Sequence, residues 1–559
     1  MSKHNIKLLT VIVVFLILIT VSTAQSTDKA LILPIAQPAS PSTWLLGQPY
    51  GNTLGAFRNA DRWYSAGQGL HFGLDFSMPC GTPLVAVADG QVTFVDDFGF
   101  GSRPHNLIMQ HPQLGFSSLY GHLLQPSDIP AGTWVTQGQV IGLSGDPDET
   151  CVSRPHLHYE LRSLDYRTAI NPVPYMNANW NMLTSIGSFS YPMFEQNLDN
   201  ARQWLNIDDQ PNVAFGGGRL NNYGLTYTNS VPTPYYASAP PARNLPILHE
   251  ATNWSLNPLG FDNCCQRYWW SKTNNDAFYV VDGGVNQRAG VYEWSITNAS
   301  PTDNISALPI PVTSPDGNYE TVLIDNRAYI KRLSDGELTP TLVMDQIPAI
   351  SPNNIHLLWI ERTEAEQFTD RPPTNIFVSN FDGTGSRMIY SDLSASAMWL
   401  DDNQLLISVR ENRTTALSIL HIIDGTLTPI GTWENLRGLS ASPGGKRLMF
   451  YLVSQAEPSL DGMYTIETRA NANLQKISWF GGYQWRDSDS VYYIPFDPAS
   501  DNQQLAYFHI PTGTHHILTD PNIQPFTIMN GDWSVSPDGK HILFHNAINR
   551  NLWVLSLND

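Results

Sequence analysis

Five polar side chains that suit metal and proton chemistry stand in three short motifs of this sequence. The motifs are His71-Phe-Gly-Leu-Asp75, Tyr120-Gly-His122-Leu and Pro155-His156-Leu-His158-Tyr. Two imidazoles and one carboxylate are a common ligand set for a catalytic zinc ion that keeps its fourth coordination position open. We therefore expect His71, Asp75 and His158 to bind the metal, and His122 and His156 to act on the water or the substrate.

The sequence around these residues indicates that strands position them. His156 and His158 are two residues apart in an apolar run, and residues at i and i+2 share one face of a strand. Both imidazoles would then point into the same cleft, with Leu157 and Tyr159 turned the other way. His122 ends a second strand-like run, and Asp75 opens a third after Gly73 has turned the chain. Sheet pairing of the three segments would give a rigid site.

Taken together, these motifs resemble those of the lysostaphin-like (LytM-like) zinc endopeptidases, which cut peptide cross-links in bacterial cell walls. The resemblance runs from about Gly55 to Pro174 and includes Gly81-Thr-Pro-Leu-Val-Ala-Val-Ala-Asp-Gly90, Gly138-Gln-Val-Ile-Gly142 and Pro155-His-Leu-His158-Tyr-Glu-Leu-Arg162.

The resemblance implies a compact β fold with a narrow groove. It also implies that His71, Asp75 and His158 are zinc ligands and that His122 and His156 are catalytic. All five positions are filled, which argues against a degenerate, metal-free member. Ser153-Arg154 stands where the family often has Thr-Gly, which leaves the substrate preference open.

Length and composition set the wider frame. A chain of 559 residues predicts two or three domains. Charged residues make up only 14% and aromatic residues 11%, with 40 Gly and 40 Pro, which is typical of a β-rich extracellular protein full of turns. The net charge of −19 argues against a nucleic-acid partner. It would also repel strongly anionic wall polymers unless the cleft is locally basic.

The four cysteines fall into two pairs. Cys80 and Cys151 both flank the expected metal site, and a disulfide between them would suit an exported protein. Cys264 and Cys265 are adjacent, and they could form a vicinal disulfide, pair between molecules or stay as buried thiols.

The N-terminal region predicts export. Residues 1–24 combine Lys3 and Lys7, an apolar run from Leu8 to Val21 and the small residues Ser22-Thr-Ala24, which is typical of a secretory signal. An uncleaved N-terminal anchor is the alternative. No later run suits a membrane span, so we expect a secreted or cell-envelope protein that leaves the membrane after signal cleavage. Residues 25–50 are rich in Pro, Ser and Ala and indicate a linker, or a segment draped over the next domain.

Residues 51–178 are expected to form the antiparallel metallopeptidase domain. Asp89-Gly90 predicts a tight turn between two strands. His111 ends a strand near the groove, where it could either line the groove or serve only the structure. Residues 179–270 receive no assignment, although 194–205 could form a short amphipathic helix.

Residues 271–559 repeat. Turn signatures begin at Ser314-Pro-Asp-Gly, Ser351-Pro-Asn-Asn, Ser442-Pro-Gly-Gly and Ser536-Pro-Asp-Gly, each followed by an apolar strand. The spacing of about 35 to 50 residues is the period of propeller blades. The repeat around 375–390 resembles the TolB-like propeller repeat, so we expect six or seven blades. Four recurring tryptophans either pack inside blades or form an aromatic ring for a ligand: Trp359, Trp399, Trp485 and Trp533.

The sequence thus predicts an all-β protein, with an antiparallel β metallopeptidase domain before a C-terminal β-propeller. The expected function is that of an exported zinc-dependent endopeptidase acting on peptidoglycan cross-links or other Gly-rich peptides, with one zinc ion in the catalytic domain. The propeller would target it or bind an unknown protein or glycan. The alternatives are a non-catalytic binding scaffold of the cell wall and a peptidase directed at rival cells. Glu160 is a candidate partner for a ligand histidine.

Overall fold

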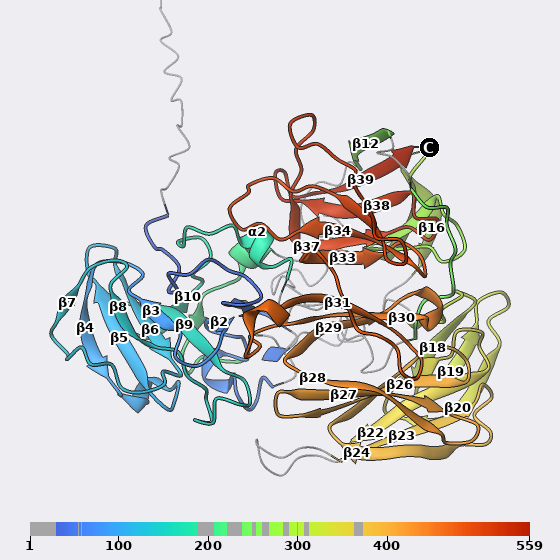
Figure 1. Cartoon of the computed structure of the whole chain (residues 1–559), viewed down its shortest axis with the longest axis horizontal. Helices are drawn as coiled ribbons and strands as arrows, with labels where there is room; N and C mark the ends of the chain where they lie inside the picture. Colours follow the sequence, from blue (N-terminus) through green and yellow to red (C-terminus); the bar gives the residue numbers. More distant parts are fainter. Residues whose placement is uncertain are drawn as a thin grey trace, which may run out of the picture.

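The computed structural model describes residues 29–53, 55–56, 59–186, 206–220, 238–248, 253–259, 268–282, 290–298, 300–306, 312–362 and 373–558. Their regular structure is nearly all β-strand, in a sheet domain and a ring of seven four-stranded sheets (Figure 1). The expected signal at 1–24, the helix at 194–205 and the pair Cys264 and Cys265 lie outside the described residues. Within the described part, no helix has the length and apolar character that a membrane span requires.

The N-terminal domain is built on one antiparallel sheet in the order β1-β2-β9-β6-β5-β4-β7, and β10 and β11 extend it beside β9. β3 and β8 form a second, two-stranded sheet. The strands are β1 (Leu45–Gln48), β2 (Leu74–Ser77), β3 (Pro83–Val85), β4 (Gly90–Val95), β5 (Asn106–His111), β6 (Phe116–Gly121), β7 (Trp134–Val135), β8 (Val140–Leu143), β9 (His156–Ser163), β10 (Thr168–Ile170) and β11 (Val213–Ala214). The predicted antiparallel architecture is confirmed.

The alternation of side chains along β9 explains how the sheet separates its core from its cleft. Leu157, Tyr159 and Leu161 are fully buried in the main apolar cluster of this domain. His156 and His158 therefore point to the opposite face, because successive strand residues alternate between faces. The turn at Asp89-Gly90 also lies between strands, but β3 pairs with β8 and β4 pairs with β5 and β7.

The segment 25–50, expected either as a linker or as a segment draped over the next domain, packs on the domain from residue 29 onward. β1 pairs with β2 along one edge of the sheet, and Leu31, Ile35 and Trp44 are buried in the same core as β9. These apolar side chains, spaced among the prolines, give the segment enough buried surface to pack.

Each propeller blade is a four-stranded antiparallel sheet, and seven blades close the ring. Six of them run in chain order: β13 (Tyr268–Trp270) to β16 (Ser300–Ser306), β17 (Val312–Thr313) to β20 (Leu338–Met344), β21 (Ala349–Ile350) to β24 (Arg387–Leu393), β25 (Ala395–Trp399) to β28 (Leu427–Glu434), β29 (Leu436–Ala441) to β32 (Gln475–Lys476), and β33 (Gly481–Trp485) to β36 (Thr514–Ile517).

The strands inside these six blades complete the description. They are β14 (Ala277–Asp282), β15 (Gly290–Ser295), β18 (Tyr319–Ile324), β19 (Arg327–Arg332), β22 (His356–Arg362), β23 (Pro373–Asn380), β26 (Gln404–Glu411), β27 (Thr414–His421), β30 (Arg447–Leu452), β31 (Gly462–Glu467), β34 (Ser490–Pro495) and β35 (Ala506–His509).

The seventh blade closes the ring with strands from both ends of the propeller. β12 (Asn253–Pro258) pairs with β39 (Asn551–Asn558), followed by β38 (His541–Asn546) and β37 (Ile528–Val535). β12 and β13 lie within 179–270, so part of the unassigned region is propeller. The sequence missed it because the turn signature that marks later blades does not precede these strands.

The serine of each predicted turn signature has a structural role. Ser314, Ser351, Ser442 and Ser536 are buried, and each hydroxyl accepts a hydrogen bond from the backbone N–H five residues later, at the start of the next strand. The serine of each repeat therefore fixes the turn to the strand that follows it.

The four recurring tryptophans were expected either to pack inside blades or to form an aromatic ring for a ligand. Trp359, Trp399 and Trp533 are buried in blade cores, whereas Trp485 is half-buried.

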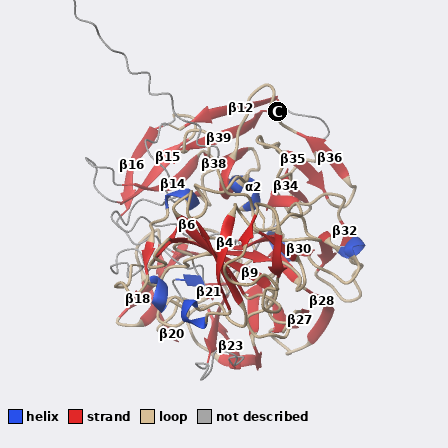
Figure 2. Cartoon of the chain, turned by 90° about the vertical axis from the view of Figure 1, so that its left-hand side faces the viewer, coloured by secondary structure: helices blue, strands red, loops and turns tan. Residues whose placement is uncertain are grey.

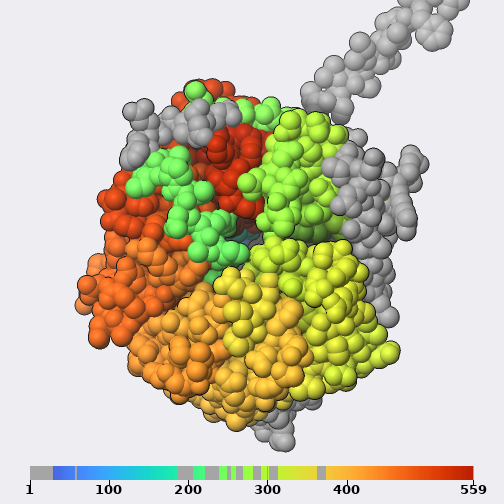
Figure 3. Space-filling view, turned by 90° about the vertical axis from the view of Figure 1, so that its right-hand side faces the viewer, coloured from blue at the N-terminus to red at the C-terminus, as the bar shows by residue number. Residues whose placement is uncertain are grey.

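The sheet domain sits over one face of the ring (Figure 2). Leu45 and Ile186 pack in a cluster with Met449 and Tyr451 of the propeller. The short helix α2 (Trp180–Leu183) adds Met182 to the core between the last two blades. Residues 238–248 lie across the opposite face, where Pro240 accepts a hydrogen bond from the Gly444 N–H (Figure 3). The contacts of Leu45, Ile186 and Met182 with the propeller give the two domains a shared apolar interface.

Short 3₁₀ helices occupy several loops. They are Ser65–Gly67, Phe98–Phe100, Ile207–Asp209, Pro443–Gly445 and Pro458–Leu460.

Cys80 and Cys151 form the expected disulfide, which joins the end of β2 to the loop before β9 across 71 residues of sequence. Closing a loop of this size stabilises a domain by about 4 kcal/mol in the chain-entropy account. We expect the C80S/C151S double variant to unfold at a lower temperature in calorimetry. Reduced wild-type protein should behave like the variant, and equal midpoints for oxidised wild type and variant would contradict the expectation.

Candidate active site

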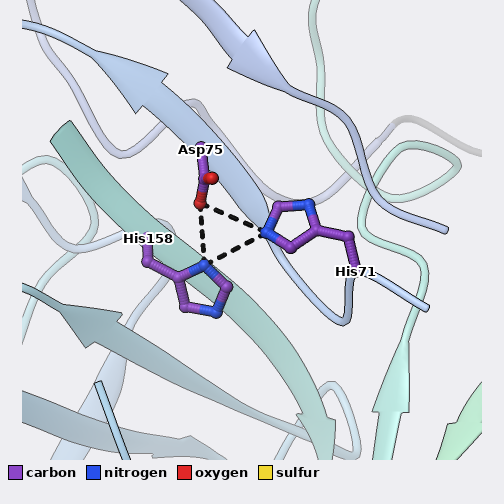
Figure 4. A group of neighbouring side chains, drawn as sticks. All are labelled: His71, Asp75 and His158. Atoms are coloured by element: carbon purple, nitrogen blue, oxygen red, sulfur yellow. Dashed lines mark hydrogen bonds and ion pairs between the residues drawn. The ribbon is translucent and has the colours of Figure 1, made fainter. Parts of the chain in front are cut away.

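His71, Asp75 and His158 converge on one face of the sheet (Figure 4). His158 Nδ1 lies 2.8 Å and His71 Nε2 3.3 Å from Asp75 Oδ1, and the two imidazole nitrogens are 3.3 Å apart. One ligand atom from each residue therefore lies within 4.8 Å of the others. This is the arrangement that the spacing of the motifs predicts.

Strand register brings these residues together from distant parts of the chain. Asp75 pairs opposite His158, and Ser77 pairs opposite His156, in the antiparallel ladder of β2 and β9. Gly73 permits the close approach, because a Cβ at this position would lie 2.6 Å from both His158 Cε1 and the Tyr159 carbonyl oxygen. Only glycine lets the turn pass so near the second histidine.

Hydrogen bonds on the outer side of each imidazole set its tautomer. His71 Nδ1 donates to the Pro49 carbonyl at 2.6 Å, and His158 Nε2 donates to Glu160 Oε1 at 3.2 Å. In the neutral tautomers, His71 Nε2 and His158 Nδ1 then carry lone pairs directed at Asp75 Oδ1. Lone pairs facing one another at 2.8–3.3 Å repel unless a cation lies among them, so this donor set fits a divalent metal ion.

Asp75 is ready to act as an anionic ligand. Burial opposes ionisation of its carboxyl group, but the imidazoles of His71, His156 and His158 around it favour the carboxylate more strongly than burial disfavours it. The pKa of Asp75 is therefore held well below its usual range.

Glu160 and Arg162 support the site from behind. Glu160 is fully buried, and its second oxygen accepts a hydrogen bond from Arg162 Nε at 2.7 Å. The guanidinium of Arg162 lies over the ring of Phe215, 4.4 Å from its centroid. The sequence pointed to Glu160, but Arg162 was not singled out, because its partners are fixed only by the fold.

His122 and His156 face each other beside the three donors. Their ring centroids are 4.8 Å apart, and His156 Nε2 lies 3.8 Å from Asp75 Oδ1. His122 Nδ1 donates to the Arg103 carbonyl and His156 Nδ1 donates to the Arg154 carbonyl. Burial lowers the pKa of both imidazoles, so each is neutral at pH 7 and its Nε2 can accept a proton.

His111 does not belong to this group. It is buried, with Nδ1 bonded to the Asp89 carbonyl and Nε2 to Ser118 Oγ, and it does not line the cleft. The structural alternative is therefore the correct one.

An open cleft of about 1190 Å³ contains all five polar residues. Aromatic side chains form much of its wall, among them Trp63, Phe72, Phe100 and Phe215. Four lining residues come from outside the segment 51–178 expected to form the domain, so no sequence motif indicated them: Gly47, Gln48, Phe215 and Arg437.

The departure at Ser153-Arg154 has a local explanation. Asp146 Oδ2 accepts hydrogen bonds from the N–H groups of both residues, each at 3.2 Å. This orders the loop before β9 and leaves Arg154 over the ring of Trp63 at the cleft wall, 5.3 Å from its centroid.

Residues 69–172 match the sequence model of peptidase family M23. They form an M23 domain. The resemblance to lysostaphin-like endopeptidases is thus confirmed for this part of the chain, which holds all five polar residues of the cleft.

Relatives of the M23 domain are named as peptidases. The chain is 39% identical over 94 residues to the DD-carboxypeptidase/endopeptidase Mpg of Neisseria meningitidis. The matched stretch covers 17% of this chain and 20% of that protein. It is 35% identical over 116 residues to the peptidoglycan DD-endopeptidase ShyA of Vibrio cholerae, which covers 21% of this chain and 24% of that protein. The chain therefore matches only about a quarter or less of the length of these relatives.

The propeller has similar solved structures. One is a putative TolB from Agrobacterium tumefaciens, with 14% identity and a TM-score of 0.27 over 44% of this chain and 89% of that one. The seven blades follow from the sheets described above.

Proposed function

We propose that this protein is a zinc-dependent metalloendopeptidase that hydrolyses peptide cross-links of bacterial peptidoglycan. The observation that carries the proposal is the convergence of three donor atoms beside two neutral imidazoles in one cleft. The M23 family is a metallopeptidase family, and the name of the relative ShyA, a peptidoglycan DD-endopeptidase, supplies the substrate class.

His71 Nε2, Asp75 Oδ1 and His158 Nδ1 are the proposed zinc ligands. A zinc ion bound there would lower the pKa of a coordinated water and polarise the scissile carbonyl. The Pro49 carbonyl and Glu160 hold the two imidazoles in the orientation that this requires.

His156 and His122 are the proposed catalytic residues. His156 Nε2 lies on the side of Asp75, close to the ligand atoms, and is placed to accept the proton of the attacking water. His122 stands across from His156, and once its Nε2 has taken up a proton it is placed to donate a hydrogen bond to the substrate oxygen on which negative charge develops. Backbone carbonyls fix both rings by their Nδ1 atoms, which leaves both Nε2 atoms facing the cleft.

The proposed setting is outside the cytoplasm. The Cys80–Cys151 disulfide supports an oxidising compartment, which agrees with the signal expected at residues 1–24. The propeller is proposed to target the enzyme or to bind a partner, protein or glycan.

Purified full-length protein tests the proposal directly. We expect it to release peptides from isolated peptidoglycan or to cut Gly-rich peptides, to stop after chelation and to recover on addition of zinc. Chelator-insensitive binding to cell walls without any cleavage would instead support a non-catalytic scaffold.

The hydrogen bond from His158 to Glu160 gives a separate prediction. Glu160→Gln removes the charge that favours the Nε2–H tautomer of His158, so zinc affinity should fall by about 10- to 100-fold. A competition titration with a chromogenic chelator measures the change. Glu467→Gln, which alters an ion-paired glutamate in the propeller, should leave zinc affinity unchanged. Equal affinities for E160Q and wild type would contradict the assignment.

A further inference from the structure

The cleft of the M23 domain has one wall residue that belongs to the propeller. Arg437 lies on β29, an edge strand of its blade, and lines the same cleft as the five polar residues. It also lines a small crevice between the two domains, together with Leu46 and Ser77. Its side chain is therefore placed where the propeller meets the β1–β2 edge of the sheet.

This edge is next to the proposed chemistry. Ser77 is the cross-strand partner of His156, and Ser77 and Gly47 line the cleft with Arg437. Gly47 is itself close to Asp75, because a Cβ added to it would lie 3.1 Å from the Asp75 carbonyl oxygen. Arg437 thus borders β1 and β2, the strand pair that carries the proposed ligand Asp75. β2 in turn pairs with β9, which carries the proposed base His156.

The domain interface fixes the position of Arg437. Its backbone pairs opposite Tyr451, and Tyr451 packs with Leu45 of β1 in one apolar cluster. The Ser454 N–H donates to the Pro41 carbonyl at 3.0 Å, which ties the same blade to the segment that precedes β1. A residue held by both domains in this way can contribute a defined position to the cleft.

The charge of the cleft differs from that of the chain. The whole protein has a net charge of −19, yet the cleft lining carries four arginines and only two aspartates: Arg154, Arg162, Arg167, Arg437, Asp75 and Asp165. Clefts lined by one sign of charge concentrate ligands of the opposite sign. The sequence predicted that an acidic protein would need a locally basic cleft for anionic wall material, and this lining provides it.

We propose that Arg437 binds a carboxylate of the peptide substrate, so that the propeller forms part of the substrate-binding site and selects peptides with free carboxylates. The inference rests on the proposed endopeptidase function. A guanidinium carries five N–H donors in a planar fork that matches a carboxylate. Arg437 already takes part in an interaction within the protein, and a guanidinium can serve more than one partner. It is a positioning residue, since the reacting atoms are served by the M23 domain.

The test compares soluble peptidoglycan fragments with the same fragments after chemical amidation of their carboxylates. With zinc-loaded full-length protein, Arg437→Ala should raise KM for the unmodified fragments about tenfold or more, with kcat little changed. It should leave KM for the amidated fragments near the wild-type value. Arg437→Lys should fall between the two, because it keeps the charge and loses the fork.

The controls separate folding, binding and chemistry. Arg469→Ala removes an exposed arginine from the same blade, outside the cleft lining, and should have no effect. Thermal unfolding of R437A and R437K verifies that both variants are folded. Binding of both fragments to H156A and to H156A/R437A, measured by calorimetry, gives a readout that does not depend on turnover.

The outcomes are distinct for the two proposals. If wild type cleaves the fragments but R437A loses affinity for both kinds equally, or for neither, the role of Arg437 is overturned and the endopeptidase proposal stands. If wild type cleaves neither kind, the endopeptidase proposal fails. The calorimetry on the H156A pair then still decides whether Arg437 binds a carboxylate.

Discussion

Replacing Asp75 with alanine should abolish both zinc binding and hydrolysis. The carboxylate is the only anionic donor among the three converging side chains, and its loss leaves two imidazoles whose lone pairs face each other at 3.3 Å. We expect zinc content to fall from about one ion per chain to near zero, and activity to fall roughly 10³-fold or more. Elemental analysis of the purified protein and a peptide-release assay measure the two effects.

Asp165→Ala is the matched control for this experiment. Asp165 lines the same cleft and carries the same charge, but its carboxylate bonds Ser163 and the Arg167 N–H and not the imidazoles. The control should keep its zinc and its activity. Adding excess zinc should rescue chelator-treated wild type and not D75A. Stoichiometric zinc in D75A would show that the metal lies elsewhere.

Replacing His156 with alanine should separate the two effects, because it should remove hydrolytic activity and leave zinc binding intact. Its Nε2 is 3.8 Å from Asp75 Oδ1, close enough to serve the water but not one of the three converging donors. Loss of a general base typically costs about 10²- to 10⁴-fold in rate. We expect kcat to fall by that factor, with zinc content unchanged.

His122→Ala should resemble His156→Ala if both act on the reacting groups. The double variant should then be little worse than either single variant, since residues that act as a unit are not additive. His105→Ala is the control, because His105 pairs with Asp96 outside the cleft lining. Loss of zinc from H156A would move this residue into the ligand set.

The prediction from sequence was accurate where a local period carries the information. His156 and His158 could be placed on one face because strand side chains alternate, and the buried Leu157 and Tyr159 between and beyond them follow the same rule. The serine turns of the propeller were visible for a similar reason, since each is a local signal next to an apolar strand. Blade count could only be bounded, because the blades that begin at β13, β25 and β33 lack the Ser-Pro turn after their first strand.

The disulfide shows an intermediate case. Cys80 and Cys151 could be paired as a hypothesis because both flank the metal motifs, and the fold then brings them together. The sequence of residues 25–50 leaves open whether they form a linker or pack on the domain, because the apolar positions among the prolines follow no strand or helix period. Their place is decided by the surface that the domain leaves uncovered.

The sequence by itself determined the candidate site of this protein: which three side chains could hold a metal, which two imidazoles lie beside them and that strands carry them. These features depend on residue type and short spacing. Only the tertiary structure decided that Glu160 and Pro49 orient the ligands, that Phe215 lines the cleft and that the propeller places Arg437 at its edge. The contacts of Glu160 and Pro49 depend on how the folded sheet domain directs these groups toward the two imidazoles. Arg437 reaches the cleft because two independently patterned domains bury a shared apolar interface.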